Sequence, residues 1–383
     1  MGILRVILAI SIVITHSESF FGFRLVHGVA AVQIFFIMSG FYMTMILDKK
    51  YRGKGSYALF LSNRFLRLYP MYWTILFLAF ILSLISFLLF DNWFILSSYG
   101  KYFHIISFET FLFQIFTNLA VFGQDIALFL GMNPETGTIF FTSNFQNSDP
   151  KFYSFLLIPQ AWSLGIEVVF YLIAPFIVRR KNLSIIIIIV SSLFIRLLTY
   201  FMGYQNDPWT YRFFPFELAL FLLGTISYRI YQSRPKIIFS NKSNQYLVAI
   251  LFFTILIFYD FIPTNSGHLL HIKNWALYII TSLALPFIFE LSKLSKYDLK
   301  LGEFSYPIYI SHLLIIDLIS PFLSSLKLQE YQGEFTILLT LILSHYLIKF
   351  ISEPIEKIRQ SRVKVQHMPK QAINIRNTDI SRK

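Results

Sequence analysis

The chain has 383 residues, of which 56% are hydrophobic and 19% aromatic, whereas only 14% are charged. Because a soluble domain usually carries about 25% charged residues, this composition excludes a soluble globular protein and indicates a polytopic membrane protein. The chain contains no cysteine, which excludes disulfide bonds, a thiol nucleophile and a thiolate metal site. The formal net charge of +13 fits the basic cytoplasmic loops of a membrane protein, so we expect a lipid bilayer and no nucleic acid as its partner.

Apolar segments of about 20 residues, the length that crosses a bilayer, recur along the chain. They predict an all-α integral membrane protein with about ten transmembrane helices, near residues 2–18, 26–47, 68–90, 154–178, 183–202, 213–231, 246–262, 272–292, 304–322 and 334–352. With the N-terminus in the cytoplasm, 26 of the 33 Lys and Arg residues fall on the cytoplasmic side, which predicts that both termini are cytoplasmic. Residues 1–360 are expected to form one transmembrane domain, and residues 361–383 a basic, polar and disordered tail.

The segment between the third and fourth spans, residues 91–152, contains a further apolar run from Phe103 to Phe122. An eleventh span here would invert every later loop and remove the charge asymmetry, so the run is expected to be an interfacial or re-entrant helix on the outer face. The first span shares a basic start and a short apolar region with signal peptides. No small-residue cleavage site follows His16, which favours a retained helix.

Two ionisable residues, Arg5 and His16, lie within the first apolar segment. A separation of eleven residues is close to three helical turns, so both side chains are expected on one face, about 16 Å apart along the axis. Ionisable side chains inside a membrane are costly and usually serve a function. The pair therefore predicts a cation near the cytoplasmic surface and a titratable imidazole in the outer half of the bilayer.

The second and third spans supply small and basic residues. Ser39 and Gly40 interrupt an aromatic run, which allows either a ligand or a neighbouring helix to approach the backbone closely. Arg64 and Arg67, three positions apart, fall on one helix face before Pro70, and two neighbouring guanidiniums suit a phosphate group. The alternative for this pair is the ordinary flanking charge of a membrane helix.

The fourth span carries a polar stripe, because Ser163, Glu167 and Tyr171 follow one another at four-residue intervals. Glu167 is a candidate catalytic carboxylate, since buried ionisable groups in a membrane are usually functional. A structural ion pair with Arg196 or Arg212 is the alternative for Glu167.

Trp162, Tyr171 and Ser39 are candidates for substrate contact, as is His312 near the middle of the ninth span. Trp162 and Tyr171 could instead anchor their helix at the membrane interface, and a lone intramembrane histidine often only bonds a neighbouring helix. Taken with the topology, these positions predict a basic cluster at the cytoplasmic surface and titratable residues deeper along one tunnel. No motif of a known metal site appears, so no metal is expected.

Six motifs, in this order, resemble those of the membrane acyltransferase family 3, the ten-span enzymes that O-acylate cell-surface glycans. The motifs are Arg-x10-His at 5–16, Phe-Phe-x-x-Ser-Gly-Phe at 35–41, Arg-x2-Arg-x2-Pro at 64–70, Trp-Ser-Leu-x-x-Glu-x-x-Phe-Tyr at 162–171, Ser-Tyr-Pro-Ile-Tyr-x-x-His at 305–312 and Glu-Pro at 353–354. The resemblance covers about residues 1–360. One departure is Val168, where this family often has a second acidic residue.

The resemblance implies an O-acyltransferase of a bacterial inner membrane, with acyl-CoA, commonly acetyl-CoA, as co-substrate and a surface glycan or lipid-linked sugar as acceptor. It implies that Arg5, Arg64 and Arg67 hold the donor phosphates. It also implies that His16 acts as general base or transient acyl carrier, with Glu167 orienting or charging it. The leading alternative is a transporter or flippase of a lipid-linked saccharide, whereas a structural or sensor protein would leave the Arg5 and His16 pair without a role.

Overall fold

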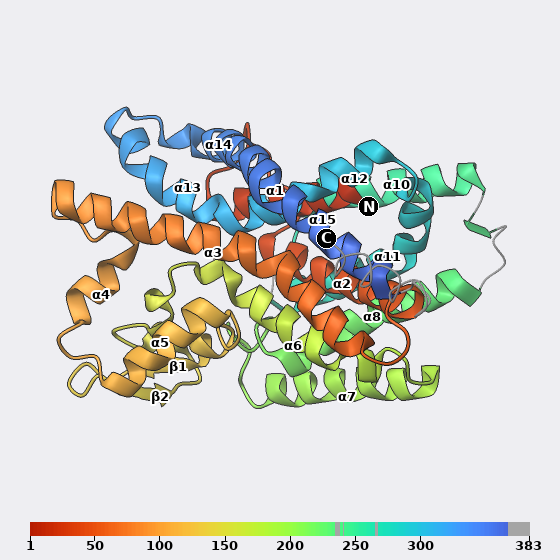
Figure 1. The fold of residues 1–383 in the computed structure, drawn as a ribbon, viewed down its shortest axis with the longest axis horizontal. Coiled ribbons are helices and arrows are strands. Elements are labelled where there is room, and N and C mark those ends of the chain that lie inside the picture. Colours follow the sequence, from red (N-terminus) through yellow and green to blue (C-terminus); the bar gives the residue numbers. More distant parts are fainter. Residues whose placement is uncertain (234–237, 240, 265–266, 367–383) are drawn as a thin grey trace, which may run out of the picture.

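The computed structural model describes residues 1–233, 238–239, 241–264 and 267–366, and these residues form a bundle of helices beside one small hairpin (Figure 1). The helices are α1 (Gly2–His16), α2 (Gly28–Lys49), α3 (Ser56–Phe90), α4 (Ser97–Tyr102), α5 (Phe108–Ala120), α6 (Trp162–Ile177), α7 (Asn182–Phe201), α8 (Phe214–Ser233), α10 (Lys242–Ile257), α11 (Gly267–Ser292), α12 (Lys296–Glu303), α13 (Ser305–Ser325), α14 (Gln332–Leu347) and α15 (Glu353–Gln366). The hairpin pairs β1 (Leu130–Met132) with β2 (Ile139–Phe141) in antiparallel register. A π-helical turn at Ile348–Ser352 joins α14 to α15.

The predicted all-α membrane fold is confirmed. Seven helical segments of the described chain are long and apolar enough to cross a bilayer, and α1 and α10 are apolar but shorter. Helix α8 also falls on a predicted span, although it carries Glu217. A helix therefore occupies each of the ten predicted ranges, while the number of true spans and the orientation of the termini stay predictions.

The carboxylate in α8 is neutralised inside the bundle. Glu217 is fully buried, accepts hydrogen bonds from Gln33 Nε2 at 2.9 and 3.0 Å, and lies 3.5 Å from the guanidinium of Arg196. A buried charge is tolerated when it is paired and hydrogen-bonded, so this network explains how α8 holds a charge at its depth. It also assigns Arg196 to Glu217, which rules out the Arg196 ion pair considered for Glu167.

The apolar run between the third and fourth spans forms α5, which at 13 residues is too short to cross a bilayer. Its polar side faces inward, because Thr110, Gln114, Thr117 and Asn118 are buried, whereas apolar side chains such as Phe116 are exposed. An outward apolar face is what a helix at a membrane interface requires. The length of α5 agrees with the expectation that no eleventh span lies here, and both this expectation and the choice between an interfacial and a re-entrant position stay predictions.

Helices α2 and α8 touch backbone to backbone at the centre of the bundle. A Cβ atom added to Gly40 would lie 1.8 Å from the carbonyl oxygen of Phe221, and one added to Gly224 would lie 1.9 Å from that of Ile37. Only glycine permits such an approach. The predicted role of Gly40 in helix packing is confirmed, and it leaves the neighbouring Ser39 on the side that faces α6.

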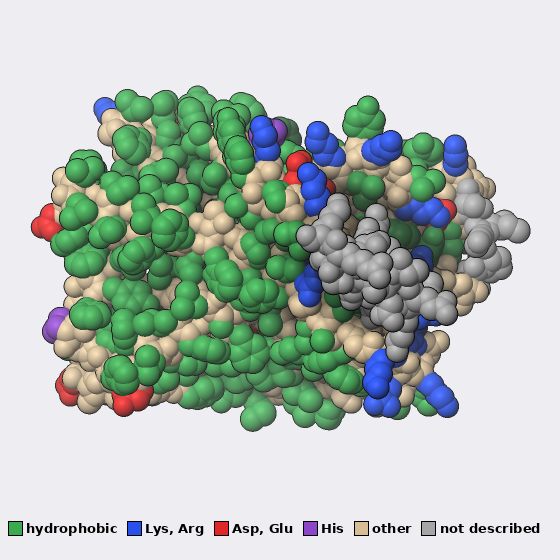
Figure 2. All heavy atoms as spheres, in the orientation of Figure 1, with side chains coloured by type: hydrophobic (Ala, Val, Ile, Leu, Met, Phe, Trp, Pro, Cys, Tyr) green, Lys and Arg blue, Asp and Glu red, His purple; other side chains and the backbone are tan. Residues whose placement is uncertain are grey.

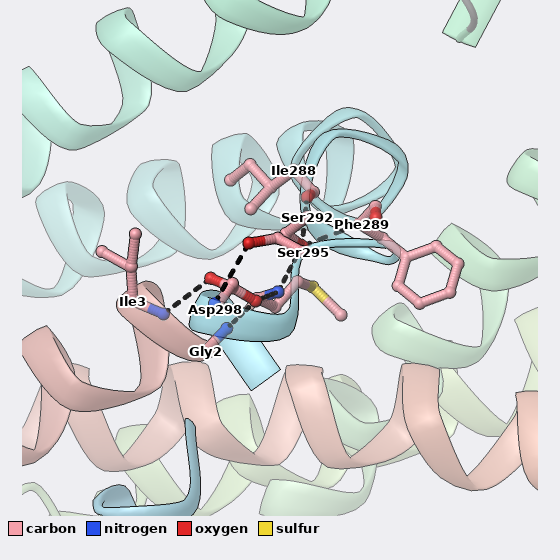
Figure 3. A network of polar contacts seen from close by, with 8 residues as sticks. Gly2, Ile3, Ile288, Phe289, Ser292, Ser295 and Asp298 are labelled. Carbon is pink, nitrogen blue, oxygen red and sulfur yellow. Dashed lines mark hydrogen bonds and ion pairs between the residues drawn. The ribbon is translucent and has the colours of Figure 1, made fainter. Parts of the chain in front are cut away.

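The start of α1 is held by a single carboxylate from α12 (Figure 3). The backbone nitrogens of Met1 and Gly2 each donate to Asp298 Oδ2 at 2.6 Å, and that of Ile3 donates to Oδ1 at 2.9 Å. These are the donors that a helix start leaves without intrahelical partners. Ser292 also accepts from the Met1 nitrogen. The contact fixes the register of α1 and thereby the positions of the two ionisable residues along it.

Lysine and arginine side chains gather over the half of the molecule that holds α12, α15 and the labelled N-terminus (Figures 1 and 2). We call this half the basic end; the opposite half carries α4, α5 and the hairpin and shows mostly apolar side chains. Helix α15 continues to Gln366, so residues 361–366 are helical where the sequence predicted the start of a disordered tail. The rest of that predicted tail, residues 367–383, lies outside the described residues.

Candidate active site

A cavity of about 330 Å³ enters the bundle from the basic end. Helices α1, α2, α3, α6, α13 and α15 surround it. We call it the basic cavity; its charged and polar lining comprises Arg5, Ser39, Tyr42, Lys50, Arg64, Arg67, Ser163, Glu167, Tyr171, Ser305, Tyr306, Tyr309, Glu356, Arg359 and Gln360. Its volume lies at the lower end of the range of small-molecule sites, roughly 300–1,000 Å³.

All three arginines singled out from the sequence line this cavity. Arg64 and Arg67 share one face of α3, as their spacing predicts, and α1 brings Arg5 to the same space. The Arg64 side chain is 7% exposed, and its Nε atom has no hydrogen-bond partner among the described residues. A buried guanidinium with an unused donor is costly unless a ligand supplies an acceptor.

Arg359 is a fourth arginine of the same cavity, and the sequence reasoning missed it. Its Nε donates to the backbone oxygen of Asn63 at 3.0 Å, and its guanidinium pairs with Glu356 one turn earlier on α15. The side chain is 11% exposed. The sequence signal was its position five residues after Pro354, among the basic residues that follow the tenth predicted span and that were counted only as cytoplasmic charge.

The predicted polar stripe of the fourth span faces the cavity, because Ser163, Glu167 and Tyr171 of α6 all line it. Ser39 of α2 lines it as well. The hydroxyl of Tyr171 donates to Glu167 Oε2 at 2.6 Å. Arg212, the other ion-pair partner considered for Glu167, bonds Asp207 instead at 2.6 Å. The carboxylate of Glu167 therefore faces the arginines of the cavity without being locked into a structural ion pair.

The two histidines singled out from the sequence contact each other. His16 Nδ1 lies 3.1 Å from His312 Nε2, with ring centroids 5.0 Å apart. His16 Nδ1 also lies 3.0 Å from the backbone oxygen of Ile12, and His312 Nδ1 lies 2.7 Å from that of Tyr309. His312 is fully buried, whereas the side chain of His16, at the end of α1, is exposed.

These contacts assign the tautomers, since a carbonyl oxygen can only accept a hydrogen bond. His312 Nδ1 must carry a proton toward Tyr309, so its Nε2 accepts. His16 Nδ1 then donates to His312 Nε2 and to the carbonyl of Ile12. The remaining nitrogen, His16 Nε2, keeps its lone pair, and it is the atom that can accept a proton or attack a carbonyl.

This arrangement corrects one expectation from the sequence. Glu167 was expected to orient His16, but its described hydrogen bond goes to Tyr171 and it lies with the arginines. The residue that orients His16 is His312. The spacing along α6 placed Glu167 on the correct face, but only the packing of α1 against α13 decides which side chain meets His16.

Tyr309 lies between the basic cavity and the histidine pair. It lines the cavity, and its ring centroid is 6.0 Å from that of His312. The hydroxyl oxygens of Tyr309 and Ser163 are 2.6 Å apart, and the Tyr309 hydroxyl also bonds the backbone oxygen of Gln160. Neither histidine lines the cavity. Tyr309 therefore connects the cavity that holds the arginine cluster with His312 and, through it, with His16.

Trp162 does not line the basic cavity, in contrast to Tyr171, the other predicted substrate contact on α6. The guanidinium of Arg212 lies 4.5 Å from the centre of its ring, and Tyr211 packs edge-on against it at 5.6 Å. Arg212 is itself held by Asp207. Trp162 thus packs against the loop that carries Asp207, Tyr211 and Arg212, and not against the arginines of the basic cavity.

Comparison with known proteins agrees with this geometry. A family model described as an acyltransferase domain, Acyl_transf_3, matches residues 1–352. The chain belongs to this acyltransferase family. The resemblance noted from six sequence motifs is thereby confirmed. No solved structure matches the chain.

Three curated relatives of this acyltransferase-family chain show how far the similarity extends. A protein of Acidianus two-tailed virus named "Putative acetyltransferase ORF330" is 28% identical over 165 residues, which are 41% of this chain and 48% of the viral protein. Protein 2 in the picA locus of Rhizobium radiobacter is 41% identical over 70 residues, or 18% of this chain and 37% of that protein. An uncharacterized protein of Aquifex aeolicus is 23% identical over 211 residues, which are 53% of this chain and 89% of that protein. The chain thus spans about half or less of the first two relatives.

Proposed function

We propose that this protein is a bacterial inner-membrane O-acyltransferase that moves an acetyl group from acetyl-CoA to a sugar hydroxyl of a surface glycan or of its lipid-linked precursor. The observation that carries the proposal is the convergence of four arginines on one cavity whose inner wall, Tyr309, also touches the histidine pair. Membership of the acyltransferase family supports the reaction class.

The donor binds in the basic cavity with its phosphates on the arginines. Coenzyme A carries a diphosphate and a 3′-phosphate, and arginine binds phosphate oxygens through paired N–H donors. Arg5, Arg64, Arg67 and Arg359 come from three helices that meet at the basic end, which the predicted topology places in the cytosol, where acetyl-CoA is made. The thioester end then extends toward Tyr309.

His16 Nε2 acts as the general base. It takes the proton of the sugar hydroxyl while that oxygen attacks the thioester carbonyl, the C–S bond breaks, and the thiolate leaves. The proton on His16 then passes to the thiolate, so that free coenzyme A and the sugar ester are the products. As His16 gains its proton, His312 Nε2 accepts a stronger hydrogen bond from His16 Nδ1, which holds the ring in place.

The thioester can meet His16 only if Tyr309 moves aside. Its hydroxyl contacts Ser163 and the backbone of Gln160, so these two hydrogen bonds must open when the donor is bound. Side chains that separate reacting partners until both are bound also keep water from the thioester. Glu167 lies on the same cavity wall as the arginines and accepts a hydrogen bond from Tyr171, so it offsets their charge and orients the cavity wall rather than the base.

The proposal is tested with purified protein in lipid nanodiscs, radiolabelled acetyl-CoA and a glycan acceptor. His16→Ala should lower acetyl transfer by about 10²- to 10⁴-fold, which is the usual contribution of a general base. Expression and membrane insertion should be unchanged. Substantial residual transfer would remove His16 as both base and acyl carrier.

A variant of the basic cavity tests whether the arginines bind acetyl-CoA. Arg67→Ala should raise the KM for acetyl-CoA while leaving kcat close to that of the wild type, since a phosphate contact is uniform binding. Arg52→Ala is the matched control, because Arg52 is exposed at the same end and, among the described residues, bonds Asp48 alone. Saccharide movement across the bilayer without acetyl-CoA consumption would instead favour a lipid-saccharide flippase.

A further inference from the structure

A second cavity, of about 450 Å³, lies between α3 and α13. We call it the α3–α13 pocket. On α3 it is lined by Ile75 and Ala79, some three turns beyond the arginine pair, and on α13 by Leu313, Leu314 and Asp317. In Figure 1 these parts of the two helices extend toward the side opposite the labelled N-terminus. The pocket therefore lies farther from the basic end than the basic cavity does.

Two acceptor groups in this pocket have no hydrogen-bond donor. Gln160 is 5% exposed; its Nε2 donates to the backbone oxygen of Ile310 at 2.8 Å, but its Oε1 has no partner among the described residues. Asp317 forms no hydrogen bond or ion pair with a described residue either, but it is exposed rather than buried. A buried acceptor left without a donor costs about 1–3 kcal/mol, and a carboxylate within a predicted span is a candidate functional group.

The pocket reaches the surface of the bundle at α13, among other places. Asp317 and Pro321 are exposed, although both lie within the predicted ninth span, residues 304–322. The wall opposite them is apolar, because Ile75 and Ala79 line it. A molecule that enters here comes from the bilayer, and it meets an apolar wall together with acceptor oxygens.

We propose that the α3–α13 pocket is the binding site of a lipid-linked saccharide, which enters laterally from the membrane. Sugar hydroxyls donate to Gln160 Oε1 and to the carboxylate of Asp317, and the lipid chain leaves along the exposed surface of α13. A carboxylate disfavours a phosphate beside it, so the sugar rather than a carrier phosphate fills the pocket. A plain fatty chain would leave both acceptors unsatisfied.

The pocket is connected to the reaction centre through Gln160. The backbone oxygen of this residue accepts the hydroxyl of Tyr309, and its side chain holds the backbone of Ile310, two residues before His312. A ligand that rearranges Gln160 therefore acts on the same tyrosine that connects the donor cavity with the histidine pair. This inference deepens the proposed function, because it assigns the acceptor class of the same enzyme, and it rests on that function.

The test uses the whole protein in nanodiscs with photoreactive glycolipids that carry glucose, galactose or N-acetylglucosamine, and with a photoreactive diacylglycerol that carries no sugar. A glycolipid should crosslink to residues 313–321 or 154–160, as mapped by mass spectrometry, and the diacylglycerol should not. Asp317→Asn, and separately Ala79→Leu, which fills the pocket, should reduce this crosslinking about five- to tenfold. Binding of coenzyme A should be unchanged. Glu330→Gln, at an exposed acid outside the pocket, is the control.

The outcomes separate the two proposals. Pocket crosslinking that depends on the sugar and on Asp317 supports the site, even if no acetyl transfer is detected, in which case only the proposed reaction fails. Acetyl transfer to the glycolipid with no pocket crosslinking, or with both variants unchanged, overturns the site and leaves the reaction in place. Equal labelling by the diacylglycerol assigns the pocket to a fatty chain and also overturns the inference.

Discussion

The basic cavity and the α3–α13 pocket are neighbours along the same two helices, yet their linings differ in kind. The basic cavity is built mainly from side chains on helices, and its four guanidinium groups indicate an anionic ligand. The α3–α13 pocket draws much of its lining from the connecting segments 92–97 and 153–160, which contain short 3-10 turns, and its polar groups are neutral apart from one carboxylate.

The difference between the two cavities shows which kind of site helical spacing can predict. A charge within an apolar segment stands out, and the 3.6-residue period tells which other residues share its face. A pocket closed by loops has no such period, because the loop conformation depends on the helices that it connects. The two cavities also predict separate kinetic effects: variants of the first should act on the donor, and variants of the second on the acceptor.

The largest effect that tests this separation is expected at the histidine pair, which belongs to neither cavity. His312→Ala removes the acceptor for His16 Nδ1, so the imidazole loses its orientation, and kcat should fall by about 10²-fold. The KM values for both substrates should change little. His312→Gln, which keeps an acceptor oxygen in reach, should restore part of the rate, and His345→Ala, at an exposed histidine of α14, is the control. Loss of coenzyme A binding in His312→Ala would place this histidine in the donor site instead.

A smaller effect is expected from the arginine that the sequence reasoning missed. Arg359→Ala should raise the KM for acetyl-CoA by about 10-fold or more, because a hydrogen bond to a charged group contributes roughly 1.5–3 kcal/mol. The acceptor KM should stay constant. Steady-state kinetics at several acceptor concentrations measure both values. A parallel rise in the acceptor KM would show that the two cavities are not independent. It would contradict the assignment of the donor to one cavity and the acceptor to the other.

The smallest effect on activity is expected at Asp125, a buried carboxylate beside Gly165 at the start of α6. Asp125 is 6% exposed, and burial raises its pKa from 3.8 to about 6. Because the folded pKa is the higher one, the free energy of unfolding is largest below pH 3.8 and declines as the pH rises through 6, by about 3 kcal/mol at most. Asp125→Asn should therefore raise the thermal stability at pH 7.5 without changing either KM.

Thermal unfolding in detergent at pH 5 and pH 7.5 checks the Asp125 prediction. The gain in stability should be present at pH 7.5 and smaller at pH 5, where the wild-type carboxyl is mostly protonated. Glu135→Gln, at an exposed acid of the same outer segment, should change neither value. An equal gain at both pH values would show that the effect comes from packing and not from the charge.

Individual residues show how far the sequence could be interpreted. The shared face of Ser163, Glu167 and Tyr171 follows from four-residue spacing, and the structure places all three at one cavity. The same spacing could not reveal that Trp162, the neighbour of Ser163, packs beneath Arg212. It could not reveal either that the inward face of α5 is its polar one, since a regular amphipathic pattern says which residues share a face but not what that face meets.

From the sequence alone came the membrane class, the positions of ten helices, the family and most of the arginine cluster, because length, hydropathy and periodicity are local properties of a chain. Only the tertiary structure decided that His312 rather than Glu167 meets His16, that Arg359 joins the other arginines, and that Gln160 links a second pocket to Tyr309. These are contacts between segments about 150 to 300 residues apart. They depend on how whole helices pack, and no short window of sequence records that.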